Sequence, residues 1–548
     1  MKKSSRPTGL RYWMLAALEE CDNASAGFSA DPVHDLRVAL RRCRSMADGM
    51  MAMDPEHDWK AMKKAGKKLF QSLGGLRDVQ VMMDWIEKLE IATPSVARTV
   101  MSTSPEPGRT PTATPGAAAA EQKDDRDPAA RALLHILKSR ETEHKHQARG
   151  ALEEFDRKQW RQWSKSLPQR AARIRPGSAV FKHLALERWT AARDLHRRAM
   201  RNRSQVALHT LRIGIKRFRY IVENFLPEEH NAWNDDLKHL QDLLGEVHDL
   251  DVLWATALAC RVFPDEISRK AWHARIIEER TKRLDEYREK TIGPDSLWSK
   301  WRAGLPRGKQ IQDIATRRMK LWAKALDPDI AHSERVARLS LELYDGLTAR
   351  GLLNAGPHTS SDKMHEESAA NARITLYTAA LLHDVGKANG DKGHHKESMR
   401  LIQKHGTPLG WKAENFARAA IVSRFHCGAL PGRGHKALRD LPSDEQRIII
   451  RLSAILRLAN ALDSDHDGHV RRLRIESPAG SLKLHANGSG QKRPALGKSE
   501  AIVIAAEGYS DATPTAQAVA AERYLLETVL HRPVLVKPIK KAASRRVA

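Results

Sequence analysis

The sequence predicts a mainly α-helical protein with a small α+β element near the C-terminal end. Aromatic residues make up only 5% of the chain, and its apolar positions are mostly Leu, Ala, Ile and Val, a balance that favours helix over sheet. Apolar residues recur at helical spacing over long stretches, as in residues 33–51. Short apolar runs separated by Gly, Ser and Pro begin only near residue 470, where they predict a small sheet.

The first expected domain spans residues 1–310 and is helical. Clear helical runs in its first part are residues 33–51, 58–73 and 79–89. Residues 91–130 are rich in Ala, Thr, Ser and Pro, which predicts a flexible, low-complexity insertion. Helical spacing returns at about residue 130 and continues to about 303. The following segment, Gly304–Lys309, has the Gly, Pro and charge of a domain boundary.

The remaining chain is expected to hold a second helical domain, residues 311–468, and a small α+β extension of it, residues 469–540. A chain of 548 residues is too long for one ordinary core, so several domains are expected. The expected strands of the extension are Leu473–Ile475, Leu482–Leu484, Ile502–Ala506 and Val534–Val536. A helix over residues 515–530 is expected before the last strand.

The chain is strongly basic, with a formal net charge of +26 at pH 7. Such an excess attracts polyanions, and the candidates are nucleic acid, anionic membrane and polyphosphate. No apolar stretch approaches the roughly 20 residues needed to cross a bilayer, so membrane insertion is not expected. Four scattered cysteines without a C-x-x-C pair indicate neither a disulfide framework nor a zinc knuckle, and the expected compartment is the cytoplasm.

Two stretches of the sequence repeat one another in register. His34 is followed by Asp-Leu-Arg-Val-Ala-Leu-Arg-Arg-Cys-Arg, and His209 by Thr-Leu-Arg-Ile-Gly-Ile-Lys-Arg-Phe-Arg. A second matched phrase follows each of them, Leu-Gly-Gly-Leu-Arg-Asp-Val at 73–79 and Leu-Gly-Glu-Val-His-Asp-Leu at 244–250. Matched phrases in the same order imply a duplicated helical unit.

Each copy places a row of cationic side chains along one helix, because positions three and four apart share a face. The first row is His34, Arg37, Arg41 and Arg44, with Arg42 beside it, and the second is His209, Arg212, Lys216 and Arg219, with Arg217 beside it. An anionic partner with repeating charge would offset the self-repulsion of such rows, and arginine binds phosphate oxygens in bidentate fashion. Solvated faces paired with Glu and Asp are the alternative, which the repetition in register disfavours.

These phrases resemble the CHAD domain, the conserved histidine α-helical domain, over roughly residues 10–305. The resemblance implies two four-helix bundles around a basic channel that binds inorganic polyphosphate. By position, it assigns polyphosphate binding to His34, Arg37, Arg41, Arg42, Arg44, His209, Arg212, Lys216, Arg217 and Arg219. Nucleic acid remains the rival polyanion, although only Phe218 and Tyr220 lie near the rows as aromatic residues for base stacking.

Separated histidines and aspartates in the second helical domain suit a divalent metal ion. His332 stands at the start of an expected helix, the pair His383 and Asp384 stands between Ala-Leu-Leu and Val-Gly-Lys387, and Asp463 follows a further helical run. Imidazole with carboxylate suits Mn, Fe or Zn, and Mg if carboxylate and water dominate. A lone histidine is more often a core residue, but the adjacent pair with flanking ligands favours a metal site. Asp384 is expected to orient a water molecule, and Lys387 to reach a bound phosphate.

The ordered set of His, His-Asp and Asp resembles the HD superfamily of phosphohydrolases. From about residue 320 to 540 the closer likeness is to the helical C-terminal domain of the Ppx/GppA exopolyphosphatase and guanosine pentaphosphatase family. The matching phrases are Gly393-His-His-Lys-Glu-Ser, Arg424-Phe-His and Arg457-Leu-Ala. The resemblance places second-metal ligands at His395 and His426, with His394 as a further candidate. The actin-like domains that carry catalysis in Ppx/GppA proteins have no counterpart here, so any hydrolysis is expected from the HD site itself.

The sequence thus predicts a polyphosphate-binding protein with a metal-dependent HD phosphohydrolase site. Its expected substrate is polyphosphate or a polyphosphorylated nucleotide such as a guanosine polyphosphate, with Lys387, Arg424 and Arg457 neutralising phosphate charge. One alternative is a non-catalytic binding or regulatory protein associated with polyphosphate granules in the cytoplasm. A nucleic-acid-binding protein is the other alternative.

Overall fold

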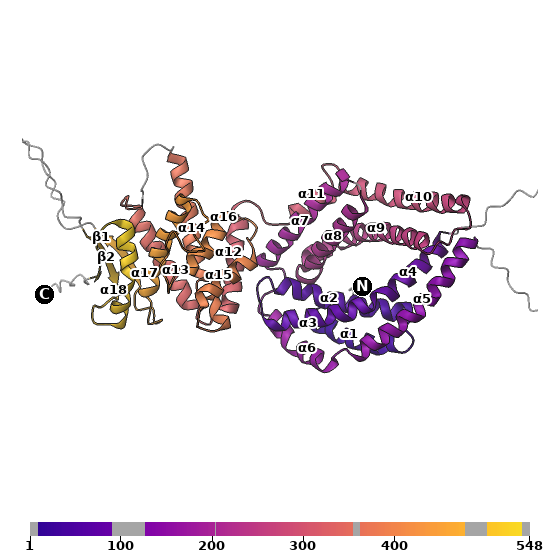
Figure 1. The fold of residues 1–548 in the computed structure, drawn as a ribbon, viewed down its shortest axis with the longest axis horizontal. Coiled ribbons are helices and arrows are strands. Elements are labelled where there is room, and N and C mark those ends of the chain that lie inside the picture. Colours follow the sequence, from indigo (N-terminus) through magenta and orange to yellow (C-terminus); the bar gives the residue numbers. More distant parts are fainter. Residues whose placement is uncertain (1–8, 90–126, 203, 354–361, 477–500, 540–548) are drawn as a thin grey trace, which may run out of the picture. The chain divides into compact units, whose positions relative to one another are not determined.

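The computed structural model describes residues 9–89, 127–202, 204–353, 362–476 and 501–539. Over these residues the chain is mainly α-helical, with eighteen α-helices, one short 3-10 helix and three strands, which confirms the predicted fold class. Between Arg307 and Gly308 the chain passes from a compact N-terminal unit to a compact C-terminal unit (Figure 1). The expected strand Leu482–Leu484 and all but the last four residues of the expected insertion lie outside the described residues.

The N-terminal unit contains two copies of one helical arrangement. The first copy consists of α1 (Leu10–Ser25), α2 (Ala30–Met50), α3 (His57–Ser72), α4 (Gly74–Lys88), α5 (Pro128–Glu153) and α6 (Arg157–Ala171). The second copy consists of α7 (Ala179–Asn202), α8 (Gln205–Phe225), α9 (Pro227–Ala259), α10 (Glu266–Thr291) and α11 (Leu297–Ala303). Helix α9 is continuous, whereas its counterpart in the first copy is divided at Leu73 into α3 and α4.

Helices α2 and α8, which carry the two cationic rows, pack against each other. Each buries an apolar face, with residues such as Leu36 in α2 and Leu211 in α8, and leaves its cationic row on another face. Gly49 permits the close approach of the two helices, because a side chain at this position would collide with the ring of Phe225. The duplicated helices are therefore direct neighbours in the fold.

A shared apolar core also joins the two copies. Trp85 of α4 and Leu133 of α5 lie in one core with Leu253 of α9 and Trp272 of α10. The indole nitrogen of Trp272 donates a 2.9 Å hydrogen bond to Asp127, whose carboxylate also caps the start of α5. These contacts fix the relative position of the two cationic rows.

The C-terminal unit is built from helices and one small sheet. Its elements are α12 (Lys309–Leu326), α13 (Ile330–Thr348), α14 (Asp362–Leu382), the 3-10 helix η1 (Val385–Asn389), α15 (His394–His405), α16 (Ala413–Arg424), α17 (Ser443–Ala461), β1 (Arg472–Glu476), β2 (Ile502–Glu507), α18 (Pro514–Leu530) and β3 (Val534–Pro538). Strand β2 lies between β1, with which it pairs antiparallel, and β3, with which it pairs parallel. Three of the four expected strands are thus confirmed.

Helix α17 is the central helix of this unit. Consecutive residues from Leu452 to Ala459 are all buried, which is typical of a helix surrounded by protein on every side. Helices α13, α14, α16 and α18 all contact it. Polar residues near its C-terminal end, such as Arg457 and Asn460, consequently point into the protein.

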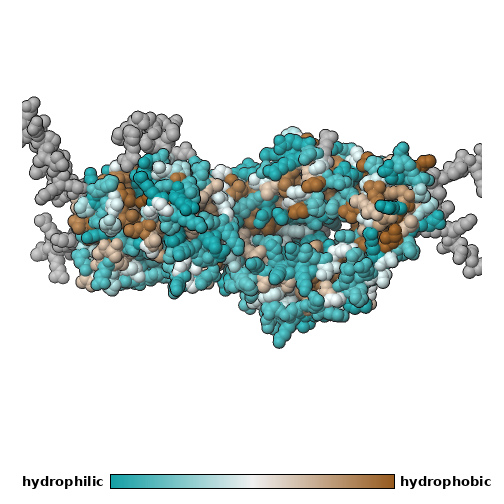
Figure 2. All heavy atoms as spheres, in the orientation of Figure 1, coloured by the Kyte–Doolittle hydropathy of each residue, from teal (hydrophilic) through white to brown (hydrophobic). Residues whose placement is uncertain are grey.

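Hydrophilic side chains predominate on the face seen in Figure 2, with scattered apolar residues between them. Among the described residues, no helix combines the length and apolar character that a membrane span requires. All four cysteines are free thiols.

Candidate functional site

The two cationic rows of the N-terminal unit meet beside the contact of α2 with α8. Burial, followed by the charges of Arg212, Arg41 and Arg37, lowers the pKa of Lys216 to about 7. The charges of Arg37 and Arg41, which belong to the first row, therefore act on Lys216 in the second row. We call Arg37, Arg41, Arg44, Arg212 and Lys216 the cationic cluster.

Several nitrogen atoms of these rows are buried and have no hydrogen-bond partner among the residues that the structure describes. They include Nε of Arg41, Arg44 and Arg212 and Nδ1 of His209. Buried donors are normally paired, so an unpaired group of them requires an explanation. A ligand with many anionic oxygen atoms would supply the acceptors.

Phe70 of α3 organises the first row. The guanidinium carbons of Arg37, Arg44 and Arg41 lie 4.2, 4.9 and 5.8 Å from its ring centroid. Arg37 also donates a 2.9 Å hydrogen bond to the Phe70 carbonyl oxygen. Such cation–π contacts hold arginines in place before a ligand binds. Phe70 was not predicted from the sequence, because one aromatic residue at the end of a helical run gives no distinctive signal.

Two aspartates from the second matched phrase also face the cationic cluster. Burial raises the pKa of Asp249 to about 6 against the opposing charge of Arg212. Burial likewise raises the pKa of Asp78, with Arg37 opposing it. Both aspartates stand at the same place of the repeated phrase, but the sequence did not indicate that they approach the cationic rows.

Some predicted members of the rows are placed differently. Arg42 and Arg219 both pair with the buried carboxylate of Glu223, the latter at 3.7 Å, so they belong to an internal ion-pair network rather than to a free binding surface. Arg217 and His34 are exposed. Adjacent helical positions point about 100° apart, which explains why Arg217 leaves the face that carries Lys216.

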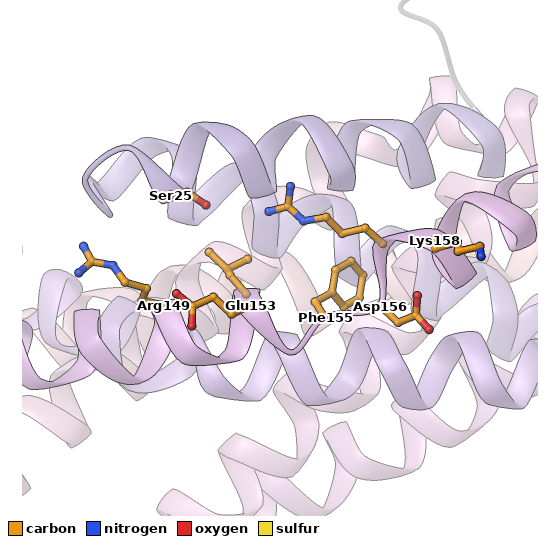
Figure 3. A pocket seen from close by; sticks show the side chains of 8 residues that line it. Ser25, Arg149, Glu153, Phe155, Asp156 and Lys158 are labelled. Carbon is orange, nitrogen blue, oxygen red and sulfur yellow. The ribbon is translucent and has the colours of Figure 1, made fainter.

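An open hollow of about 600 Å³ lies elsewhere in the N-terminal unit, between α1 and the connection of α5 to α6 (Figure 3). Its lining residues are Ser25, Arg149, Leu152, Glu153, Phe155, Asp156, Arg157 and Lys158. Both basic and acidic side chains line it, and Arg157 pairs with Asp22. None of the predicted site residues lines this hollow.

In the C-terminal unit, His383 and Asp384 lie at the turn between α14 and η1. Gly386 allows α15 to lie against this turn, because a side chain at this position would collide with the backbone of His394. Ser398 of α15 secures the contact, since its hydroxyl donates to the His383 carbonyl at 2.6 Å and accepts from the Gly386 amide at 2.9 Å. The first turn of α15 is thereby held beside Asp384.

Three imidazoles converge on the carboxylate of Asp384. His383, His394 and His426 each donate a hydrogen bond from Nδ1 to the carbonyl oxygen three residues earlier, at 2.7, 2.8 and 2.8 Å. This bond directs Nε2 of each ring toward the centre as a possible ligand atom. Nε2 of His383 lies 3.4 Å from Asp384 Oδ2, and those of His394 and His426 lie 3.3 and 3.5 Å from Oδ1.

The residues at this centre fit a divalent cation. His383 Nε2 and Asp384 Oδ1 are buried, and no described residue forms a hydrogen bond with either atom. Burial lowers the pKa of His383 and of His426, which favours the neutral form that binds metals. Burial opposes the ionisation of Asp384, but the surrounding imidazoles and the Lys387 ammonium hold its pKa well below the usual range. Donor atoms of His332, His383 and Asp384 all lie within 4.8 Å of one another.

Asp463 lies behind His332 rather than among these donor atoms. Its carboxylate is 2.8 Å from Nδ1 of His332 and accepts a 2.9 Å hydrogen bond from Arg335 and a 3.1 Å bond from the Gly468 amide. The expectation that Asp463 is a direct ligand is corrected accordingly, and its place is that of a residue that orients a ligand histidine. Asn460 Oδ1, which the sequence analysis missed, lies 3.0 Å from His332 Nε2.

His394, and not His395, lies with His426. Donor atoms of His394, His426 and Cys427 form a second group within 4.8 Å of one another. The ring centroid of His395 is 6.5 Å from that of His426, and His395 belongs to neither group of donors found among the described residues. The expected second ligand therefore shifts by one residue, because neighbouring positions of α15 face different directions. Cys427 was missed, and its adjacency to His426 was the available signal.

The basic residues expected to meet phosphate have different surroundings. The Lys387 ammonium is partly exposed and lies 2.6 Å from Asp384 Oδ2. Arg424 has a buried Nη1 atom that no residue in the described part of the chain pairs with, so it retains the capacity to bind an anion.

Arg457, in contrast, is already engaged. It donates to the carbonyl oxygens of Phe425 and Gly428 at 3.0 and 3.2 Å and pairs with Glu522 of α18 at 2.6 Å. These bonds hold both ends of the segment that carries His426. The expectation that Arg457 neutralises substrate charge is therefore replaced by a role in positioning this segment.

Family comparisons agree with this architecture. Residues 14–258 match the family model of the CHAD domain, and residues 314–488 match that of Ppx/GppA phosphatase, domain III. The chain thus combines a region similar to the CHAD domain with a region similar to domain III of Ppx/GppA phosphatases, as the sequence phrases predict. Together the two matches point to a function related to polyphosphate. Comparison with curated proteins gives no match.

Proposed function

We propose that the N-terminal unit binds inorganic polyphosphate through the cationic cluster, and that the C-terminal unit is a metal-dependent phosphohydrolase of the HD type. One observation carries the enzymatic proposal: three imidazoles, each anchored through Nδ1, direct Nε2 at the carboxylate of Asp384. His332, His383 and Asp384 would hold the ion, which is Mn, Fe, Zn or Mg by the chemistry of the donors.

When bound, such an ion would polarise a phosphoryl oxygen and make a water nucleophile available near neutral pH. The protein residues supply position and charge. Asp463 fixes the ring of His332, and Asp384 stays ionised beside the imidazoles. Lys387 and Arg424 neutralise the phosphate charge that develops during cleavage of a phosphoanhydride or phosphoester bond.

The proposed substrate is polyphosphate or a polyphosphorylated nucleotide such as a guanosine polyphosphate. Joining a polyphosphate-binding unit to a hydrolytic unit raises the local concentration of a shared substrate. A protein of this kind would act in the cytoplasm, associated with polyphosphate granules.

Polyphosphate is favoured over nucleic acid by the aromatic residues near the cationic cluster. The ring of Phe70 is occupied by arginines. Phe218 is fully buried and packs against Trp301, so it offers no platform for a base. Guanidinium nitrogens remain as the means of recognition, and they bind phosphate oxygens in bidentate fashion without any need for base stacking.

A binding experiment tests the first half of the proposal. Labelled polyphosphate is titrated with wild-type protein and with the Arg212→Ala variant, and RNA competes at fixed salt concentration, because affinities for all polyanions depend on salt. Arg198→Ala removes the same charge from an exposed position of α7 and serves as the control. We expect weaker binding for Arg212→Ala alone and poor competition by RNA. Equal losses for both variants, or tighter RNA binding, would refute the proposal.

A hydrolysis panel tests the second half. The protein is stripped with a chelator, reloaded with Mn, Mg, Fe or Zn, and assayed against polyphosphate and guanosine polyphosphates. Asp384→Asn should abolish phosphate release, whereas Asp440→Asn, at an exposed position of the same unit, should leave it unchanged. Phosphate release that persists in Asp384→Asn would show that hydrolysis does not depend on the proposed HD site.

A non-catalytic binding protein is the second candidate. The observation that favours it is the Lys387 ammonium, a cation that already lies 2.6 Å from Asp384. Elemental analysis discriminates between the two functions, because a folded protein that binds polyphosphate but retains no divalent ion would favour the non-catalytic function.

A further inference from the structure

We propose that the thiolate of Cys427 joins His394 and His426 in a second metal subsite, which takes a thiophilic divalent ion such as Zn²⁺ or Fe²⁺. The inference rests on the proposed metal centre and adds the chemical class of a second ion. Asp384 would be shared between the two positions, since its Oδ2 faces His383 whereas its Oδ1 faces the second group.

The distances between these donor atoms match a tetrahedral ion. Nε2 of His394 lies 3.0 Å from that of His426 and 3.8 Å from the Cys427 sulfur. Asp384 Oδ1 lies 3.3 Å from Nε2 of His394 and 3.5 Å from Nε2 of His426. A tetrahedral zinc with bonds of about 2.0–2.1 Å to N or O and about 2.3 Å to S has ligand separations of about 3.3 Å between N or O atoms and about 3.6 Å between N and S. The separations among the two imidazole nitrogens and Asp384 Oδ1, and that between His394 and the Cys427 sulfur, are therefore close to those that such an ion requires. The donor atoms of His426 and Cys427 lie within 4.8 Å of each other.

The two groups of donors differ in chemistry. His332, His383 and Asp384 provide two imidazoles and one carboxylate, which leaves a coordination position open for water or substrate. The second group adds a sulfur ligand and completes four donors with the shared carboxylate. Thiolate ligands select Zn and Fe over Mg and Mn. The second subsite would consequently fill all four coordination positions of a thiophilic ion, whereas the first leaves one position open for water or substrate.

The second group is also held in place by the fold. Arg457 binds the carbonyl oxygens of Phe425 and Gly428, which flank His426 and Cys427 on both sides. His426 is buried. Asp384 Oδ1, which faces this group, is also buried and has no hydrogen-bond partner within the described ranges. A ligand set that is fixed in advance, with an unsatisfied carboxylate oxygen, is what a bound cation would use.

Cobalt substitution tests the proposal without relying on activity. Full-length protein is stripped, loaded with Co²⁺, and its near-ultraviolet spectrum is recorded for wild type, Cys427→Ser and the control Cys260→Ser, which changes a partly buried cysteine of the N-terminal unit. We expect a thiolate-to-cobalt charge-transfer band in wild type and in Cys260→Ser, and its loss in Cys427→Ser. Zinc analysis should give two ions per chain for wild type and one for Cys427→Ser.

Absence of this band in wild type would overturn the proposal, as would equal zinc content in wild type and Cys427→Ser. If Cys427→Ser does not fold, His394→Ala gives the decisive measurement, because it retains the thiol but should lose both the band and the second ion. Failure of the proposed hydrolase is a separate result. If the hydrolase proposal is wrong, no phosphate is released whichever ions are bound. If the subsite proposal is wrong, a metal-loaded protein that releases phosphate lacks the charge-transfer band.

Discussion

Arg42 of α2 and Glu223 of α8 form an ion pair that joins the two copies of the repeat. Glu223 is only 5% exposed and also faces Arg219 at 3.7 Å and His230 at 3.8 Å. Burial alone would raise the pKa of Glu223, but the neighbouring His230 imidazole and the charges of Arg42 and Arg219 hold it below the usual range. One buried negative charge therefore holds cationic residues of both copies together.

Replacing this carboxylate should lower the stability of the protein but strengthen its binding of polyphosphate. We expect Glu223→Gln to lower the free energy of unfolding by about 2 kcal/mol, because two arginines lose their buried counter-charge. Polyphosphate binding should become tighter, since Arg42 and Arg219 are released to bind phosphate. Denaturant unfolding and polyphosphate titration measure the two effects, with the exposed Glu228→Gln as the charge-matched control. Weaker binding of polyphosphate by Glu223→Gln would contradict the assignment.

Polyphosphate binding should depend on pH through Lys216. Its pKa of about 7 in the free protein reflects burial first, and then the charges of Arg212, Arg41 and Arg37. A bound polyanion offsets that repulsion and raises the pKa, so binding takes up a proton. Affinity should therefore fall as pH rises above about 7. The stability of the free protein should instead rise with pH over this range. The reason is that the unfolded chain binds more protons than the folded protein between pH 7 and the ordinary lysine pKa.

The variant Lys216→Arg isolates this effect, because arginine stays charged throughout the range. Polyphosphate affinity is measured from pH 6.5 to 8.5 at constant ionic strength for wild type and variant. The difference between the two removes the titration of the terminal phosphates, which both proteins share. Identical pH dependence in the two proteins would show that Lys216 does not titrate on binding.

Much of this architecture was predictable from sequence, because it depends on repeated local patterns. The helical class, the duplicated cationic rows and the His383–Asp384 pair all appear as periodicity or as adjacent residues. The choice of His394 over His395 depends on the angle at which α15 meets η1, which no local pattern records. The network around Glu223 was equally inaccessible, since it joins residues that are remote in sequence and only become neighbours when α2 and α8 pack.

Arg457 should affect metal binding rather than substrate binding. We expect Arg457→Met to weaken metal affinity by about 10–100-fold, because the segment carrying His426 loses the bonds at both ends. Metal titration followed by calorimetry provides the measurement. Glu522→Gln, which keeps the bonds from Arg457 to the carbonyl oxygens, should have a smaller effect. Unchanged metal affinity with a raised KM would instead return Arg457 to the role of a phosphate ligand.

Substitutions of Asp463 and of His383 should weaken metal binding to different extents. Asp463→Asn leaves His332 in place and removes only the charge behind it, so a loss of about 10–100-fold in metal affinity or activity is expected. His383→Ala removes a donor atom and should abolish tight metal binding. Elemental analysis after gel filtration compares the two variants. An equally complete loss of metal from Asp463→Asn would make Asp463 a direct ligand after all.

The most direct test of the whole account is steady-state phosphate release from long-chain polyphosphate by metal-loaded protein. Wild type, Asp384→Asn and the double variant Arg41→Ala/Arg212→Ala are compared over a range of substrate concentrations. We expect metal-dependent release by wild type, none by Asp384→Asn, and a raised KM with little change in kcat for the double variant. Phosphate release that is absent with every metal, or that persists in Asp384→Asn, would contradict this expectation.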